Sequence, residues 1–179
     1  MGEQTIEYIA QGIGIVGMVI SILSFQCKRN RDLCIAQAIS GGMFAINFAL
    51  LGALSGGAMN FINVFRGFLF AFIPEKHRMK VSVGLIAAYA AATVVTFGTP
   101  FFWNGVFSIL VCLAQTVGTI FMHINDGQKL RIAQLAFVSP VWLSHNIYFF
   151  SIGGIICECF SITSVIVSMI RYRGGKFEK

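Results

Sequence analysis

Ionisable and amide side chains stand inside long apolar runs of this chain, and their types decide which chemistry is open to it. Arg66 could hold an anionic or polyhydroxyl group, and Trp142 could offer a stacking surface. Charged groups inside a bilayer cost at least about 2.5–3.5 kcal/mol, so they usually face a cavity or a partner. We predict a solute site lined by Asn47, Asn60, Asn63, Arg66, Trp142, His145, Asn146 and Glu158.

Three of these side chains have structural interpretations that stay open. Asn60, Asn63 and Arg66 recur every three residues, so they share one broad face of a helix. Arg66 and Glu158 differ in depth by roughly 7–8 Å along the helix axis, so they could form a structural ion pair instead of lining a site. His145 could relay protons beside Glu158, because an imidazole titrates near neutral pH, or it could be a packing residue.

Three further residues could control access to such a site. Gln37 and Gln134 stand near the ends of equivalent apolar runs, where they would gate the inner mouth or join helices by hydrogen bonds. Pro140 interrupts its run and removes one backbone hydrogen bond. It would therefore act as a hinge or leave a static kink.

The composition excludes a surface that faces water. Of the 179 residues, 56% are hydrophobic and 11% are charged, and the mean hydropathy is +0.79. A soluble domain carries about 25% charged residues. The apolar runs have the length that a helix needs to cross a hydrocarbon core of about 30 Å. They predict seven helices, over Tyr8–Cys27, Leu33–Ala53, Gly56–Ile73, Val81–Phe97, Phe101–Met122, Ile132–Phe150 and Ile152–Ile170. The predicted fold class is an all-α polytopic membrane protein.

The basic residues predict the orientation of these helices. Apart from Arg66, every Lys and Arg follows the first, third, fifth or seventh run, and the other links contain neither. By the positive-inside rule, those four links face the cytoplasm. The N-terminus is then outside and the C-terminus inside. Because the excess charge sits at membrane edges rather than on one basic face, we expect no nucleic-acid partner.

An internal repeat relates the first three runs to the last three. A shift of 97 positions lays Leu33, Ile35, Ala36 and Gln37 over Leu130, Ile132, Ala133 and Gln134, and Gly56-Gly57 over Gly153-Gly154. The repeats have the same orientation, which is one pattern of secondary transporters. Residues 1–179 then form a single transmembrane domain, in which a first triplet (8–73) is joined by a linker helix (81–97) to a second triplet (101–170).

Local motifs add a resemblance to a known family. They are Ala10-Gln11-Gly12-Ile13-Gly14, Leu51-Gly52, Asn63 with Arg66, Trp142 with His145-Asn146, Ser151-Ile152-Gly153-Gly154, Glu158 and Ile170-Arg171. Together with the repeat, they resemble bacterial inner-membrane proteins of the YgjV family, which look like distant relatives of the SWEET, PQ-loop and PnuC-type transporters. The resemblance implies a three-plus-one-plus-three fold with a solute site between the triplets. The Pro-Gln pair of PQ-loop members is replaced by Ser24-Phe25-Gln26.

These observations predict a small transporter that moves a small polar solute across a bacterial inner membrane by facilitated diffusion, with proton coupling as the alternative. The sequence holds no His-x-x-x-His pair, no Gly-x-Ser-x-Gly elbow and no phosphate-binding loop. We therefore expect no enzyme activity, cofactor or metal, with membrane lipids and the solute as partners and a homo-oligomer left open. A non-transporting receptor or assembly protein on the same fold is the competing interpretation.

Overall fold

The computed structural model describes residues 3–24, 30–98, 104–124 and 132–171. Its α-helices are α1 (Glu3–Ser24), α2 (Asn30–Leu50), α3 (Leu54–Phe72), α4 (Arg78–Gly98), α5 (Val106–Ile124), α7 (Ser139–Tyr148) and α8 (Ile152–Arg171). A short 3-10 helix η1 (Glu75–His77) precedes α4, and a π-helical segment η2 (Gln134–Val138) precedes α7. Within the described ranges there is no strand, which confirms the all-helical prediction.

Each helix overlaps a predicted run, although α1 begins five residues before its predicted start, and one run changes form. Positions 25–27 and 101–103 of the predicted runs lie outside the described residues. The sixth run, predicted as one helix, contains the π-helical turn of η2 followed directly by α7. Pro140 lies at the start of α7 and has no N–H to donate, which accounts for the irregular ladder before it. Two segments, Gln4–Ser24 and Arg78–Val95, are long and apolar enough to cross a membrane, judged by length and composition.

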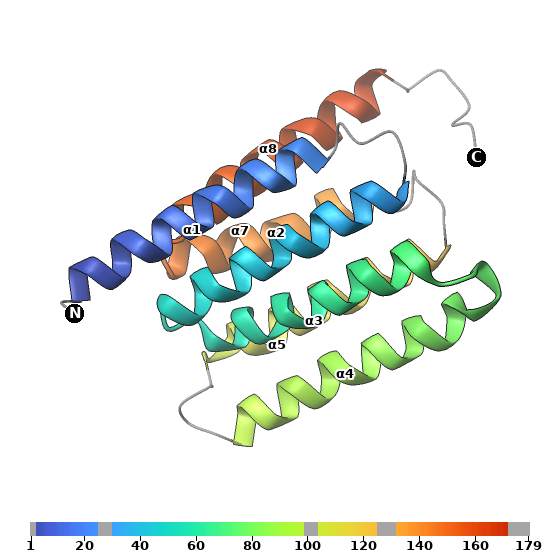
Figure 1. The fold of residues 1–179 in the computed structure, drawn as a ribbon, viewed down its shortest axis with the longest axis horizontal. Coiled ribbons are helices and arrows are strands. Elements are labelled where there is room, and N and C mark those ends of the chain that lie inside the picture. The colour runs from blue at the N-terminus through green and yellow to red at the C-terminus, as the bar shows by residue number, and fades with distance from the viewer. Residues whose placement is uncertain (1–2, 25–29, 99–103, 125–131, 172–179) are drawn as a thin grey trace.

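The helices form two rows that pack against each other (Figure 1). In the first row α2 lies between α1 and α3, and in the second row α7 lies between α5 and α8. The rows meet where α1 contacts α8 and where α3 contacts α5, while α4 packs against α3 and α5. Helices α1, α3, α5 and α8 run in one direction, and α2, α4 and α7 run in the other (Figure 1).

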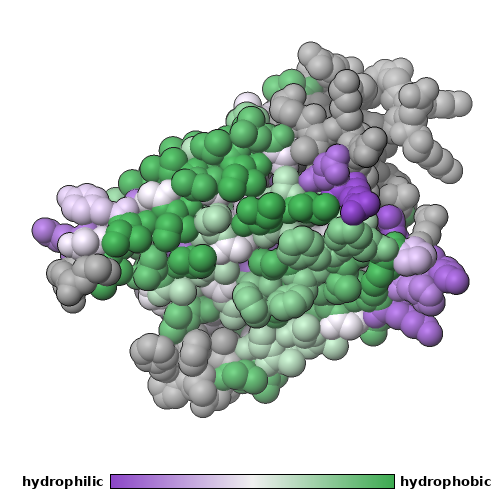
Figure 2. All heavy atoms as spheres, viewed as in Figure 1, coloured by the Kyte–Doolittle hydropathy of each residue, from purple (hydrophilic) through white to green (hydrophobic). Residues whose placement is uncertain are grey.

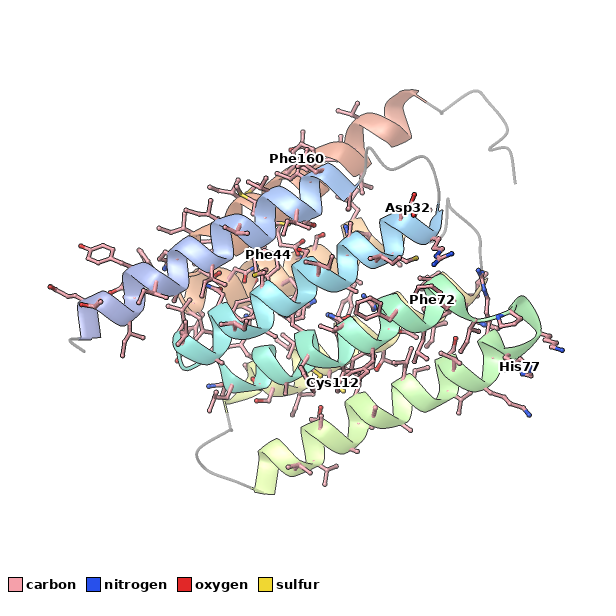
Figure 3. All side chains as sticks on the ribbon, viewed as in Figure 1. Asp32, Phe44, Phe72, His77, Cys112 and Phe160 are labelled. Atoms are coloured by element: carbon pink, nitrogen blue, oxygen red, sulfur yellow. The ribbon has the colours of Figure 1, made fainter. Side chains whose placement is uncertain are left out.

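Apolar side chains cover the outside of the bundle as well as its interior. Figure 2 shows a hydrophobic band around the middle of the visible face, with hydrophilic residues gathered toward the two ends of the helices. Phe61 and Phe65, on the outer face of α3, are 58% and 53% exposed. Asp32 and His77 both lie at the same end of the bundle, apart from each other (Figure 3). This surface suits a lipid environment between two polar boundaries.

The α2–α3 link and the α7–α8 link end their helices in the same way. The paired backbone bonds run from Ala53 N–H to Phe48 O (2.8 Å) and Gly52 N–H to Ala49 O (3.3 Å), and from Ser151 N–H to Asn146 O (2.9 Å) and Phe150 N–H to Ile147 O (3.2 Å). Both sets form a Schellman motif, in which one residue takes a positive φ. That residue is Gly52 (φ 76°) in the first link and Phe150 (φ 56°) in the second.

Candidate functional site

An enclosure of aromatic rings surrounds His145 between α2 and α7. The imidazole is fully buried, and its centroid lies 4.9 Å from the ring of Phe48 and 4.8 Å from that of Phe149. The rings of Trp142 and Phe107 lie 5.3 Å and 5.8 Å away. Because these residues come from both helix rows, His145 sits at the interface between the two predicted triplets.

The polar atoms of this enclosure have no partners within the described part of the chain. Both ring nitrogens of His145 are buried without a hydrogen bond, and so is Oδ1 of the neighbouring Asn146. Leaving such a group unpaired costs about 1–3 kcal/mol, so each one needs an explanation. A neutral imidazole offers one donor and one acceptor. The imidazole can therefore offer a solute one donor and one acceptor once the rows part, because in the described arrangement it is fully buried.

The close approach of α3 holds the imidazole in place. Gly56 lies directly against it, and a Cβ at this position would come within 2.5 Å of the His145 Cε1 atom. Across the row interface, Phe48 stacks on Trp142 with centroids 5.9 Å apart and ring planes at 21°. The polar group thus faces flat apolar surfaces, which is the usual composition of a small-molecule site.

A second polar cluster lies farther along α7, toward η2. Ser139 stands one turn before Trp142 and is fully buried. Its hydroxyl accepts a hydrogen bond from Gln134 Nε2 (2.9 Å) and is a partner of the Glu158 carboxyl of α8. The other carboxyl oxygen, Oε2, is buried without a partner among the described residues. Ser139 was not among the predicted site residues, although it is a polar residue next to a proline inside an apolar run.

Gln37 belongs to a hydrogen-bonded group that joins α2 to α1. Its Nε2 donates to Ser24 Oγ (2.5 Å) and lies 3.5 Å from Ser21 Oγ. Ser21 is also a side-chain partner of Cys157 on α8. Through Ser21 this group also reaches α8, whereas Gln134, the repeat equivalent of Gln37, bonds to Ser139 a few residues further along its own helix. The gating role of the two glutamines stays a prediction.

Asn47 is engaged on both sides of its amide. Its Nδ2 donates to Ala10 O of α1 (2.7 Å), and its Oδ1 accepts from Ser151 Oγ in the α7–α8 link (2.7 Å). The side chain is fully buried. Asn47 thus closes one end of the row interface, and it has no free polar atom for a solute in this arrangement.

Gln11 reinforces the same closure and was not predicted to have a role. Its Nε2 donates to Phe150 O (2.6 Å), and its Oε1 accepts from the backbone N–H of Ile152 (3.0 Å). These bonds satisfy backbone groups that the link between α7 and α8 leaves unpaired. The signal in the sequence was a lone amide within an apolar run, but its partners stand about 140 positions away.

Arg66 faces α5 rather than Glu158. Its Nη1 donates to Gln115 Oε1 (3.0 Å) and lies 3.5 Å from Thr119 Oγ1. The Glu158 carboxyl is instead a partner of Ser139, so the two charged residues make no ion pair with each other in the described structure. The structural pair considered from the sequence is therefore corrected. Two neutral oxygens partly satisfy the guanidinium at the second contact between the rows.

The two asparagines of α3 do not converge with Arg66. Asn60 donates to Gly56 O of its own helix (3.1 Å), and Asn63 accepts from the hydroxyl of Tyr89 in α4 (2.7 Å). A spacing of three residues turns the side chain by about 60° around the helix, which is enough to give each a different neighbour. The three side chains share one broad face of α3 but have different partners, and their solute contacts stay predictions.

An open groove of about 470 Å³ lies elsewhere, between α5 and the residues before α7. Its lining consists of Val117, Phe121, Ile132, Ala133, Ala136 and Phe137. None of these side chains can form a hydrogen bond, so the groove does not suit a polar solute.

Apolar outer surfaces, hydrophilic ends and a buried polar interface between helix rows define the class as a helical membrane protein. The chain belongs to a family described as bacterial inner membrane protein (YgjV type), whose model matches residues 8–176. It is 25% identical over 154 residues to the inner membrane protein YgjV of Escherichia coli strain K12, covering 86% of this chain and 79% of that protein. No solved structure matches it.

Proposed function

We propose that the protein is a carrier for a small polar solute, without enzyme activity, that works by alternating access between two triplets joined by α4. In this proposal α1–α3 form one triplet and α5–α8 the other, in the three-plus-one-plus-three arrangement of SWEET-like transporters. The N-terminus lies outside and the C-terminus in the cytoplasm. In this proposal one chain holds a complete solute pathway between its two triplets. Nucleotide hydrolysis does not drive transport, since the sequence holds no phosphate-binding loop.

The repeated helix ends support this arrangement. Parallel repeats should place equivalent helices in equivalent surroundings. Helix α1 contacts α8, and α3 contacts α5, which are equivalent pairs if α5 repeats α1 and α8 repeats α3. The Schellman motifs at Gly52 and Phe150 occupy equivalent links 98 residues apart. That spacing differs by one from the shift found in the sequence.

The contacts between the rows differ in a way that suits rocking. At the α1–α8 contact, the backbone of Gly153 lies against the backbone of Gly14, so that no Cβ fits at position 153. Between α2 and α7, the rows meet through large side chains such as Phe48 and Trp142. A tight backbone crossing can serve as a pivot, while an interface of rotatable side chains can open.

The observation that carries the proposal is the aromatic enclosure of His145. A static bundle gains nothing from two unpartnered imidazole nitrogens, whereas a site that must hydrogen-bond a passing solute needs them free. The surrounding rings suit a solute with one flat apolar face and polar edges. Sugars, nucleosides, aromatic amino acids and ring-containing vitamins share this chemistry.

A ligand screen tests the proposal. Purified protein is melted in detergent with sugars, amino acids, nucleosides, vitamins and organic acids, each at millimolar concentration. A ligand at 100 times its dissociation constant stabilises a protein by about 2.7 kcal/mol, which such an assay detects. Hits are then supplied in radiolabelled form to proteoliposomes.

We expect at least one hit that is lost in His145→Leu and kept in the matched control Ser144→Ala. Ser144 is exposed on the same helix, and its hydroxyl donates to Pro140 O. The rate of uptake of this ligand should be higher in proteoliposomes that contain the control variant than in liposomes without protein. A folded protein with no hit, or a hit that binds without entering, would favour the receptor interpretation.

A further inference from the structure

Glu158 places a carboxylate inside the bundle without a cationic partner. Its Oε2 is buried and has no hydrogen-bond partner among the described residues, and its only side-chain partner there is the hydroxyl of Ser139. Arg66, the basic residue within a predicted span, is bound to α5 instead. A carboxyl group in such a place is stable only when it is protonated or has something positive nearby.

The helix backbone before Ser139 lacks one donor of its hydrogen-bond ladder. Ser139 N–H bonds to Gln134 O across the π-helical turn, and the next bond of that ladder would run from residue 140 to Leu135 O. Residue 140 is proline and cannot donate. The Leu135 carbonyl therefore lacks this donor, and it lies one turn before Ser139 on the same side of the helix. Segment η2 packs against α8, which carries Glu158.

The Glu158 carboxyl, the Ser139 hydroxyl and the Leu135 carbonyl all present oxygen atoms, and Ser139 is the partner of Glu158. Carboxylate, hydroxyl and carbonyl oxygens bind hard cations, and freed carbonyls of interrupted helices coordinate Na⁺ in transporters of several folds. One carboxylate balances one positive charge. Divalent and transition metals usually need more protein ligands, and the described residues contain no group of three His, Cys, Asp or Glu side chains that could hold such an ion.

A proton is the competing occupant of this site. Oε2 makes no hydrogen bond among the described residues, and a protonated Oε2 would become a donor that needs an acceptor such as the Leu135 carbonyl. The Ser139 hydroxyl already accepts a bond from Gln134. A cation can instead contact Oε2, the hydroxyl and the carbonyl at once.

We propose that the Glu158 carboxylate, the Ser139 hydroxyl and the Leu135 carbonyl form a binding site for Na⁺. A role for Na⁺ in coupling solute movement rests on the carrier function proposed above. The binding of Na⁺ does not rest on it, because binding is measured in the absence of any solute. A solute screen without hits would therefore remove the carrier function and leave the cation site standing.

The test uses the full chain in detergent micelles. Choline chloride is replaced stepwise by NaCl at constant ionic strength and pH, and the melting temperature is recorded at each step. A parallel titration with KCl tests whether the effect is specific to Na⁺, because a site with so few protein ligands should not favour K⁺. The variants are Glu158→Gln, which keeps the shape of the side chain, Ser139→Ala, and the control Ser144→Ala.

We expect a saturable rise in melting temperature with Na⁺ but not with K⁺, in the wild type and in Ser144→Ala. The midpoint of the titration should move at least tenfold higher in Ser139→Ala, and the response should vanish in Glu158→Gln. Equal responses to Na⁺ and K⁺, or an unchanged midpoint in Ser139→Ala, would overturn the site. Stabilisation by lower pH with no Na⁺ response would make the proton the occupant and also overturn it.

Discussion

Gly52 and Phe150 hold the same position in two copies of one helix-ending motif, with φ values of 76° and 56°. The position suits glycine, because a left-handed backbone costs an ordinary residue roughly 1–2 kcal/mol. Phe150 accepts this cost, and its carbonyl receives the hydrogen bond from Gln11 that fixes the α7–α8 link. The two links therefore share one backbone conformation, but only the first has the glycine that would predict it from the sequence.

Exchanging the residue types should move stability in opposite directions. Gly52→Ala should lower the free energy of unfolding by about 1 kcal/mol, because a Cβ there meets nothing within 4 Å and only the backbone strain remains. Phe150→Gly should raise it by about 1 kcal/mol, because the Gln11 bond goes to the backbone. Chemical unfolding in micelles measures both. A large loss of stability in Phe150→Gly would show that its ring, which is 68% exposed, stabilises the fold.

Gly56 should tolerate no side chain, because the His145 imidazole occupies the space that a Cβ would take. Gly56→Ala places a Cβ within 2.5 Å of that ring and should cost about 1–3 kcal/mol of unfolding free energy. Gly84→Ala is the matched control, since it lies within α4 with nothing within 4 Å of an added Cβ. The control should be neutral or stabilising by up to about 1 kcal/mol. Equal effects of the two substitutions would mean that α3 does not press on His145.

The Arg66 guanidinium should depend more on Gln115 than on Thr119. Gln115→Leu removes the 3.0 Å acceptor of a charged donor, which is worth about 1.5–3 kcal/mol. Thr119→Val removes a contact at 3.5 Å and should cost less than about 1 kcal/mol. Unfolding of the two variants under identical conditions gives the comparison. If Thr119→Val cost more, the guanidinium would have to be placed differently between α3 and α5.

His145 separates a binding role from a packing role. If its nitrogens serve a solute, His145→Leu should leave the unfolding free energy unchanged or raise it by about 1 kcal/mol, because two unpartnered polar atoms disappear from the interior. A packing role, or a hydrogen bond to an internal water, predicts a loss of more than about 1 kcal/mol instead. Chemical denaturation of the purified variant without solute distinguishes these cases.

Much of the fold could be predicted from the sequence, because the signal is local. An apolar run of sufficient length predicts a helix whatever its partners are, and the ends of α8 and α3 lie within two residues of their predicted bounds. The π-helical turn before α7 was less accessible. Pro140 predicts an interruption of the helical hydrogen bonds, but whether the helix then kinks or forms a wider turn depends on the helices packed against it.

The candidate site could be predicted only by residue type. Buried polar groups were recognised correctly as unusual, but their partners were not, because these lie far away in the chain. Asn47 is satisfied by Ser151, 104 positions later, and Arg66 by Gln115, 49 positions later. Gln115 and Thr119 did give a signal, as two polar residues one turn apart in an apolar run, and this signal predicts a polar partner on a neighbouring helix.

Alternating access predicts that a buried position between the rows becomes reachable from both sides of the membrane. In a variant whose five natural cysteines are replaced, Ser139→Cys is treated with a membrane-impermeant maleimide in vesicles of each orientation. Gln4→Cys and Lys76→Cys, both exposed at opposite ends of the bundle, serve as markers of the two sides.

We expect Gln4→Cys to react only from outside, Lys76→Cys only from the cytoplasm, and Ser139→Cys from either side at a slower rate. Ser139 is fully buried in the described arrangement, so reaction at that position requires the rows to part. Labelling of Ser139→Cys from one side only, or from neither while both markers react, would contradict the carrier.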